Sequence, residues 1–107
     1  MERVILLLDT LKSELTWYAN TVGYKTTAHF FCDDDLQKYV IVDVTDADYP
    51  GEYSVVIMMM AHIDGDVIVI DADITDKPLY EALMHAGIPR EKIILAYAGE
   101  QVPQKTV

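Results

Sequence analysis

The chain has 107 residues, of which 51% are hydrophobic and 24% charged, and this composition excludes a disordered protein and favours one globular domain. Eighteen acidic residues against eight scattered basic residues give a formal charge of −10, which disfavours direct binding to nucleic acid. The apolar run Val4–Leu8 is too short for a membrane span or a signal-peptide core, and the single cysteine, Cys32, cannot form an internal disulfide. We therefore expect a cytoplasmic protein.

An amphipathic helix is predicted from Glu2 to Val22. Its apolar residues recur at spacings of four and three, which places one set on a single helix face: Val4, Leu8, Leu11, Leu15, Tyr18 and Val22. Gly23 suits a C-terminal cap. Trp17 either widens the apolar stripe or lies exposed at a contact, and the sequence favours core packing.

Two strands are predicted next, at Thr26–Cys32 and Tyr39–Val44, because both runs are rich in β-branched and aromatic residues. The acidic run Asp33–Asp35 lies between them as a polar turn, so we expect an antiparallel hairpin. A loop follows at Asp46–Gly51, which ends in a Pro-Gly pair typical of turns.

A long apolar run from Tyr53 to Ile63 predicts a strand that is covered on both faces, or one whose second face meets a partner. It contains Met58, Met59 and Met60, whose side chains must alternate between the two faces of a strand. The sequence favours core packing for this group. Contact with a partner or with a second copy of the chain is the other interpretation, since an exposed edge strand is also expected.

The Asp64-Gly65 pair is a hairpin signal that joins this strand to the next one, Val67–Ile70. Thr75 or Asp76 is expected to cap a second helix, with Pro78 in its first turn and a narrow buried stripe: Leu79, Leu83 and Ala86.

Gly87 suits a left-handed helix exit, and Pro89 suits the opening of a further turn. Ile93–Tyr97 then completes the sheet, and residues 98–107 lack periodicity, which predicts a flexible tail. Together these elements predict a single α+β domain over residues 1–107. It has a long N-terminal helix, a four-stranded and largely antiparallel sheet, a second helix and a final strand, with both helices on one face.

Candidate catalytic and metal-binding residues are sparse. Four aspartates offer a weak site for a hard cation: Asp64, Asp66, Asp71 and Asp73. Strand-forming residues interrupt the spacing that a calcium loop requires, so turns and caps explain these aspartates better. Three histidines lack the spacing of a zinc motif: His29, His62 and His85. No phosphate loop, dinucleotide fingerprint or nucleophile elbow is present, so we expect neither catalysis nor a cofactor.

The stretch from His62 to Tyr97 resembles the XisI-like family, named for an fdxN element excision controlling factor of cyanobacteria. The resemblance rests on a hairpin turn, a helix approach and a helix exit, and it extends more faintly back to Ala28 through Tyr39 at the start of a strand. Its main residues are those of turns and caps: Asp64, Gly65, Thr75, Gly87 and Pro89. Family members usually carry a tryptophan where this chain has Ile68, and a Gly-Phe-His-Pro-Pro-like run where it has Ala96–Glu100.

The resemblance implies the α+β fold and an accessory role in controlling excision of a DNA element, through contact with a recombinase or a companion factor. The charge of −10 favours a basic protein partner. Four residues are candidates for the contact: Trp17, Met58, Met60 and Tyr97. Two other interpretations stay open. One is an acidic inhibitor or antitoxin-like module that masks a partner nuclease, and the other is a small metal-dependent enzyme built on the aspartates.

Overall fold

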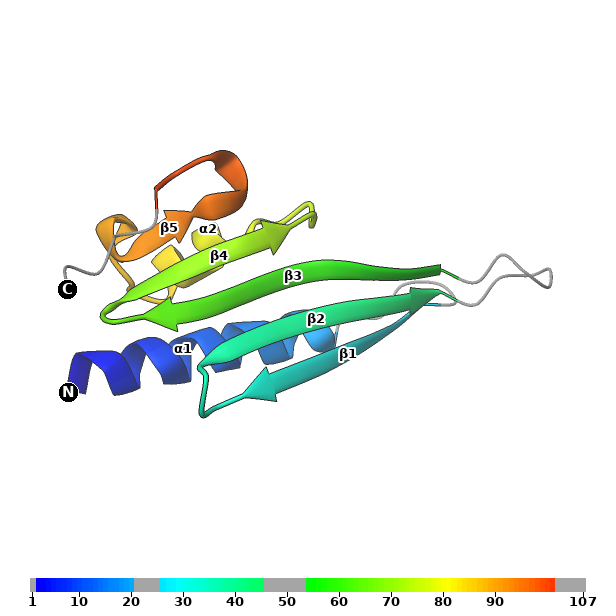
Figure 1. Ribbon diagram of the computed structural model, residues 1–107, viewed down its shortest axis with the longest axis horizontal. Helices are drawn as coiled ribbons and strands as arrows, with labels where there is room; N and C mark the ends of the chain where they lie inside the picture. Colours follow the sequence, from blue (N-terminus) through cyan, green and yellow to red (C-terminus); the bar gives the residue numbers. More distant parts are fainter. Residues whose placement is uncertain (1, 21–25, 46–53, 102–107) are drawn as a thin grey trace.

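The computed structural model describes residues 2–20, 26–45 and 54–101. Two α-helices, five strands and two single-turn 3-10 helices follow one another along the chain (Figure 1): α1 (Glu2–Ala19), β1 (Thr26–Asp33), β2 (Lys38–Thr45), β3 (Ser54–Asp64), β4 (Val67–Asp73), α2 (Leu79–His85), η1 (Arg90–Lys92), β5 (Ile93–Leu95) and η2 (Ala96–Ala98). Neither described helix is long and apolar enough to cross a membrane.

The five strands form one sheet in the order β1-β2-β3-β4-β5. The first four are antiparallel neighbours, and β5 pairs with β4 in parallel, because α2 carries the chain back along the sheet before β5 begins. The predicted α+β fold is confirmed, with the final strand joining as the fifth strand of a mixed sheet. That strand is shorter than expected, since Ala96–Ala98 turn into η2.

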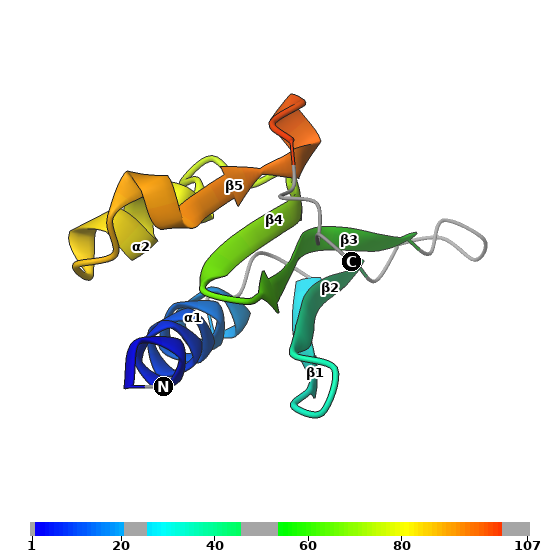
Figure 2. The same cartoon turned by 60° about the vertical axis from the view of Figure 1, so that its left-hand side comes forward.

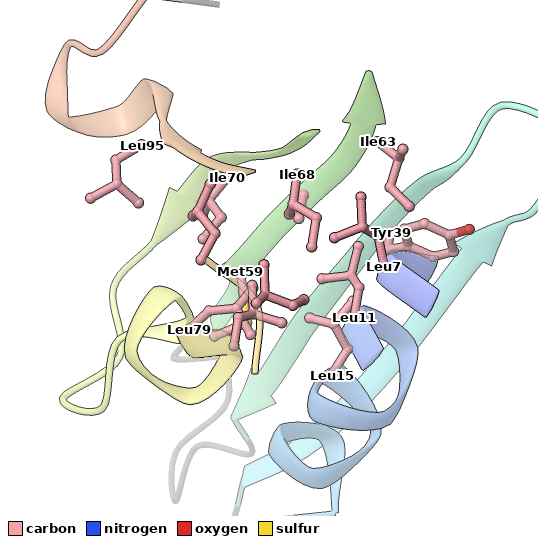
Figure 3. Packing of buried hydrophobic residues seen from close by; sticks show 14 of the residues in the cluster. Leu7, Leu11, Leu15, Tyr39, Met59, Ile63, Ile68, Ile70, Leu79 and Leu95 are labelled. Atoms are coloured by element: carbon pink, nitrogen blue, oxygen red, sulfur yellow. The ribbon is translucent and has the colours of Figure 1, made fainter. Parts of the chain in front are cut away.

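Both helices pack on one side of the sheet (Figure 2), as predicted, and the core fills the space between the two layers. Leu7, Leu11 and Leu15 project from α1 at intervals of four residues, which align on one helix face. They meet Met59 of β3 and the β4 residues beside it (Figure 3). Leu8 and Tyr18 lie at the flanks of this stripe and are only partly buried. Each fully buried leucine contributes about 1.5–3 kcal/mol through the hydrophobic effect.

The end of α1 differs from the sequence-based expectation. Trp17 is 50% exposed, so the prediction that it packs in the core is wrong. The buried stripe ends at Leu15 because the sheet and α2 contact α1 along the line of Leu7, Leu11 and Leu15, and Trp17 falls outside that line. Three predictions fall outside the described residues: the Gly23 cap, the loop Asp46–Gly51 and the tail beyond residue 101.

The three methionines of β3 do not alternate strictly between the two faces of the sheet, although one of them, Met60, points away from the other two as expected. Met59 is fully buried against the helices, whereas Met58 and Met60 are half-buried. The register passes from Ile41 opposite Met59 to Val42 opposite Ile57, so Met58 is the extra residue of a β-bulge. The bulge leaves Met58 on the helix side, packed against the core, while Met60 lies on the other face.

Asp73, at the end of β4, accepts a hydrogen bond from the first backbone N–H of α2. Its Oδ2 accepts the backbone N–H of Leu79 at 2.7 Å, and its Oδ1 accepts the N–H of Thr75 at 2.9 Å. Thr75 and Asp76 therefore do not cap the helix as predicted, because β4 continues to Asp73 and brings that carboxylate up to the helix start. Pro78 precedes the first turn instead of lying within it.

The end of α2 follows the prediction. Gly87 has φ +104°, a left-handed conformation that favours glycine, and its N–H bonds to the carbonyl of Met84. The N–H of Ile88 bonds to the carbonyl of Leu83, and Ile88 is buried next to the core, which completes a Schellman exit. Ala86 is exposed, so the buried stripe of α2 consists of Leu79 and Leu83.

Candidate protein-contact surfaces

The side of the sheet away from the helices carries apolar residues from three neighbouring strands. We call this surface the open face and define it by six residues: His29, Phe31, Val40, Val42, Ile57 and Met60. Strand alternation places them opposite the buried residues of the same strands, such as Tyr39 and Ile41. No described helix covers this side (Figure 2).

Strand register arranges the open face in rows. Phe31 lies opposite Val40, and Val40 lies opposite Met60, so three apolar side chains from β1, β2 and β3 stand side by side. Phe31 is 57% exposed and stacks on His29 with ring centroids 6.3 Å apart. A depression of about 230 Å³ lies among these side chains and offers room for a side chain of a partner.

A groove opens on the helix side, beyond the point where the core ends. Nine residues line it, and we call it the α1 groove: Trp17, Tyr18, Ile41, Asp43, Met58, Met59, Thr75, Asp76 and Lys77. Its volume is about 240 Å³. The Tyr18 hydroxyl donates a hydrogen bond to the Lys77 carbonyl, which ties the end of α1 to the loop before α2. Lys77 Nζ lies 5.7 Å from the centroid of the Trp17 ring.

The four contact candidates do not form one surface. Trp17 and Met58 meet in the α1 groove, whereas Met60 lies on the open face. Tyr97 belongs to η2 and is 42% exposed beyond β5, where burial raises the pKa of its phenol. Phe31 was missed by the sequence interpretation. Its prominence depends on the pairing of β1 with β2, although its alternation with Phe30 in an aromatic strand was a usable signal.

Three of the four weak metal candidates are engaged with other groups of the chain. Asp66 forms an ion pair with Lys92 at 2.6 Å, Asp71 Oδ2 lies 2.7 Å from His62 Nδ1, and Asp73 serves the start of α2. Asp64 lies opposite Val67 at the hairpin turn. Over residues 2–20, 26–45 and 54–101, no group of three histidine, cysteine or acidic side chains is arranged to hold a metal ion.

Several cationic side chains are already paired with acids. Lys12 contacts Asp34 at 3.1 Å and Arg90 contacts Glu100 at 2.5 Å, in addition to the pair that Lys92 forms. These ion pairs occupy cationic side chains that would otherwise be available to neutralise the phosphates of a nucleic acid. With a formal charge of −10, the surface is left with an excess of carboxylates.

A comparison with protein families gives a match along nearly the whole sequence. The family model described as XisI protein matches residues 1–106. The chain belongs to the XisI family. A search of curated proteins gave no match.

Two solved structures share the fold of this XisI-family chain. One is an XisI-like protein from Anabaena variabilis ATCC 29413, with a TM-score of 0.75, 22% identity, and coverage of 94% of this chain and 89% of that chain. The other is the fdxN element excision controlling factor XisI from the same organism, with a TM-score of 0.72, 18% identity, and coverage of 89% and 92%. At these identities the likeness establishes the fold.

The two departures from the usual family sequence have defined places in the fold. Ile68 is fully buried in the core between the sheet and the helices. Ala96–Glu100 forms η2 and its exit, and Gly99 adopts φ +89°. The Glu100 carboxylate accepts the N–H of Leu95 at 2.9 Å and pairs with Arg90, so the first residues after η2 are tied to the end of β5.

Proposed function

We propose that this XisI-family chain is a non-catalytic accessory factor that controls excision of a DNA element by contacting a recombinase or a companion factor. Family membership supports the biological context, because the Anabaena variabilis relative is described as an fdxN element excision controlling factor. The proposal assigns chemistry on DNA to the partner. The chain itself supplies a binding surface.

The open face is the observation that carries this proposal. Contiguous apolar patches on the surface of a soluble protein commonly mark contacts with other proteins. Phe31, Val40 and Met60 form such a patch, and the exposed aromatic ring of Phe31 is the type of residue that anchors interfaces. The depression beside it can receive a side chain of the partner.

The charge of the chain indicates which partner chemistry is favoured. A chain with a formal net charge of −10 repels nucleic acid and attracts a basic protein. Salt screens the attraction between exposed charges. A protein that acts on DNA carries basic surfaces of the required sign. We therefore expect a basic protein partner whose apolar residues contact the open face.

A second candidate function follows from the same charge. An acidic module that covers the basic nucleic-acid site of a partner nuclease would use the same electrostatic attraction. A nuclease assay on the purified complex separates the two functions. Inhibition of cleavage by this chain favours the inhibitor, and unchanged cleavage favours the excision factor.

Binding to the products of neighbouring genes tests the proposal directly. Each product is purified, and its affinity for the chain is measured by surface plasmon resonance between about 50 and 300 mM salt. We expect saturable binding to a recombinase or companion factor that weakens as salt rises. Phe31→Ser should weaken it by tenfold or more, roughly the effect of removing an interface anchor.

Met84→Ser is the matched control, because Met84 is an exposed apolar residue on α2, which packs on the helix side of the sheet. We expect this variant to bind as the wild type does. Equal binding by wild type and Phe31→Ser, or tight binding of the isolated chain to duplex DNA, contradicts the proposal.

A further inference from the structure

The α1 groove has apolar and aromatic walls. Trp17 stands on one side at the end of α1, and Ile41 and Met58 of the sheet form the other side. Half of the Trp17 side chain remains exposed, while Met58 packs against the core and is fixed by the β-bulge. At about 240 Å³ the groove is smaller than a usual site for a cofactor or drug-sized ligand and fits a single side chain.

The charges around the groove favour a cation. Asp43 and Asp76 contribute two carboxylates, and Lys77 is the only cation among the described residues that line it. The Asp43 carboxylate has no hydrogen bond or ion pair with any described side chain or backbone group, and burial raises its pKa. Burying such a group without a partner is unfavourable, so a cationic donor placed beside it would stabilise its charged form.

The surroundings of Lys77 and Tyr18 show that the groove accommodates a cation and is bordered by acidic side chains. The ammonium of Lys77 lies over the Trp17 ring, so the ring already interacts with a cation supplied by the chain itself. The pKa of Tyr18 is raised to about 12 by burial and by the nearby charges of Asp73, Glu14 and Glu81. Glu14 and Glu81 line a second groove between α1 and α2, with a volume of about 360 Å³, and Trp17, Tyr18 and Lys77 belong to both grooves.

We propose that the α1 groove binds an arginine side chain of a partner protein, with the guanidinium stacked on Trp17 and bonded to Asp43. Guanidinium is planar, stacks on aromatic rings and donates paired hydrogen bonds to carboxylates, so it matches an aromatic wall beside an unpaired acid. The groove lies on the helix side of the sheet, separate from the open face. This site is therefore a second contact, and it does not depend on the open face being the first.

Trp17 makes the site measurable, because it is the only tryptophan of the chain and it lines the α1 groove. The Asp43 variant then distinguishes this groove from the neighbouring one, which Trp17 also lines but Asp43 does not. The purified full chain is titrated with N-acetyl-arginine amide, and the fluorescence of Trp17 is followed. N-acetyl-citrulline amide is the matched control, since its side chain has nearly the same shape without the charge. We expect a saturable change in the millimolar range with the arginine probe and none with the citrulline probe.

Three variants sharpen the test. Asp43→Asn should weaken arginine binding about tenfold, whereas Asp35→Asn makes the same change in net charge on the exposed β1–β2 turn and should have no effect. Lys77→Ala removes the competing cation and should strengthen binding roughly threefold. Thermal unfolding confirms that each variant is folded.

Equal responses to the two probes, or no saturation with arginine, overturn the proposal. It is also overturned if Asp43→Asn binds as tightly as Asp35→Asn, or if Lys77→Ala weakens binding or leaves it unchanged. None of these results bears on the open face, because that surface is tested by Phe31→Ser with a whole partner protein.

Discussion

Removing the Asp73 carboxylate should destabilise the protein much more than removing the nearby Asp76 carboxylate, because only Asp73 bonds to the start of α2. Asp73 Oδ2 accepts the N–H of Leu79 at 2.7 Å, and Oδ1 accepts the N–H and hydroxyl of Thr75 at 2.9 and 2.6 Å. Loss of a helix-capping bond costs about 1 kcal/mol. Two further bonds to a partly exposed carboxylate add about 0.5–1 kcal/mol each. Asp73→Ala should therefore lose about 2–3 kcal/mol of unfolding free energy.

Urea unfolding at neutral pH, followed by circular dichroism, measures this loss, and thermal unfolding should show a fall in Tm of roughly 10 °C. Asp76→Ala is the matched control. Asp76 is exposed and its side chain has no hydrogen bond with any described group, so its removal should cost less than about 0.5 kcal/mol. An Asp76→Ala loss equal to or larger than that of Asp73→Ala would refute the assignment of Asp73 as the residue that holds the start of the helix.

Three further predictions concern the core and two titrating groups. Met59→Ala should cost about 2–5 kcal/mol because Met59 is fully buried, whereas Met60→Ala on the half-buried open face should cost clearly less in the same urea experiment; equal losses would contradict the alternation of β3. Hydrogen bonds from the backbone N–H of Leu95, the larger cause, and from the Arg90 guanidinium hold the pKa of Glu100 below its usual 4.5. The stability that Glu100 provides is therefore present above pH 4.5 and is lost as pH falls through the lowered folded-state pKa. In Glu100→Gln the urea midpoint should change less with pH over that acidic range. An unchanged pH dependence of the midpoint would count against the bond from the Leu95 N–H to Glu100. Burial raises the pKa of Tyr18 from 10 to about 12, so stability should fall as pH rises from 10 towards 12, and Tyr18→Phe should lessen that fall in thermal unfolding; an identical alkaline profile would disprove this.

The elements with strong local signals were predictable from the sequence. The spacing of Leu11 and Leu15 was sufficient for a helix, and Asp64-Gly65 was sufficient for a hairpin turn, in which Gly65 adopts φ +64°. The Gly87 exit followed from the need for a left-handed residue at the end of α2. Each of these signals depends on neighbours only a few residues away.

Features that depend on contacts between distant residues were missed. The sequence placed the end of the fourth strand at Ile70, but pairing with β3 extends β4 to Asp73, which turns that residue into the helix partner. Trp17 was assigned to the core because the periodicity of a helix does not reveal where its partners end. The bulge at Met58 depends on pairing between β2 and β3.

The candidate surfaces also depend on contacts between residues that are distant in the sequence. The row of Phe31, Val40 and Met60 exists because β1, β2 and β3 pair in one register, which no single segment specifies. The α1 groove combines Trp17 with Asp43, which lie on different elements. The sign of the charge and the family resemblance could be read from the sequence alone, and so could four contact candidates, but not that these candidates lie on separate surfaces.

The central claim is that this XisI-family chain controls excision of a DNA element through protein contact at the open face. The most direct measurement counts sequencing reads across excision junctions in cells of the source organism that lack the gene, after complementation with wild type, Phe31→Ser or Met84→Ser. We predict that wild type and Met84→Ser restore the junction reads of the parental strain, whereas Phe31→Ser leaves them at the level of the deletion strain. Junction reads that do not change when the gene is removed, or that Phe31→Ser restores in full, would contradict the account.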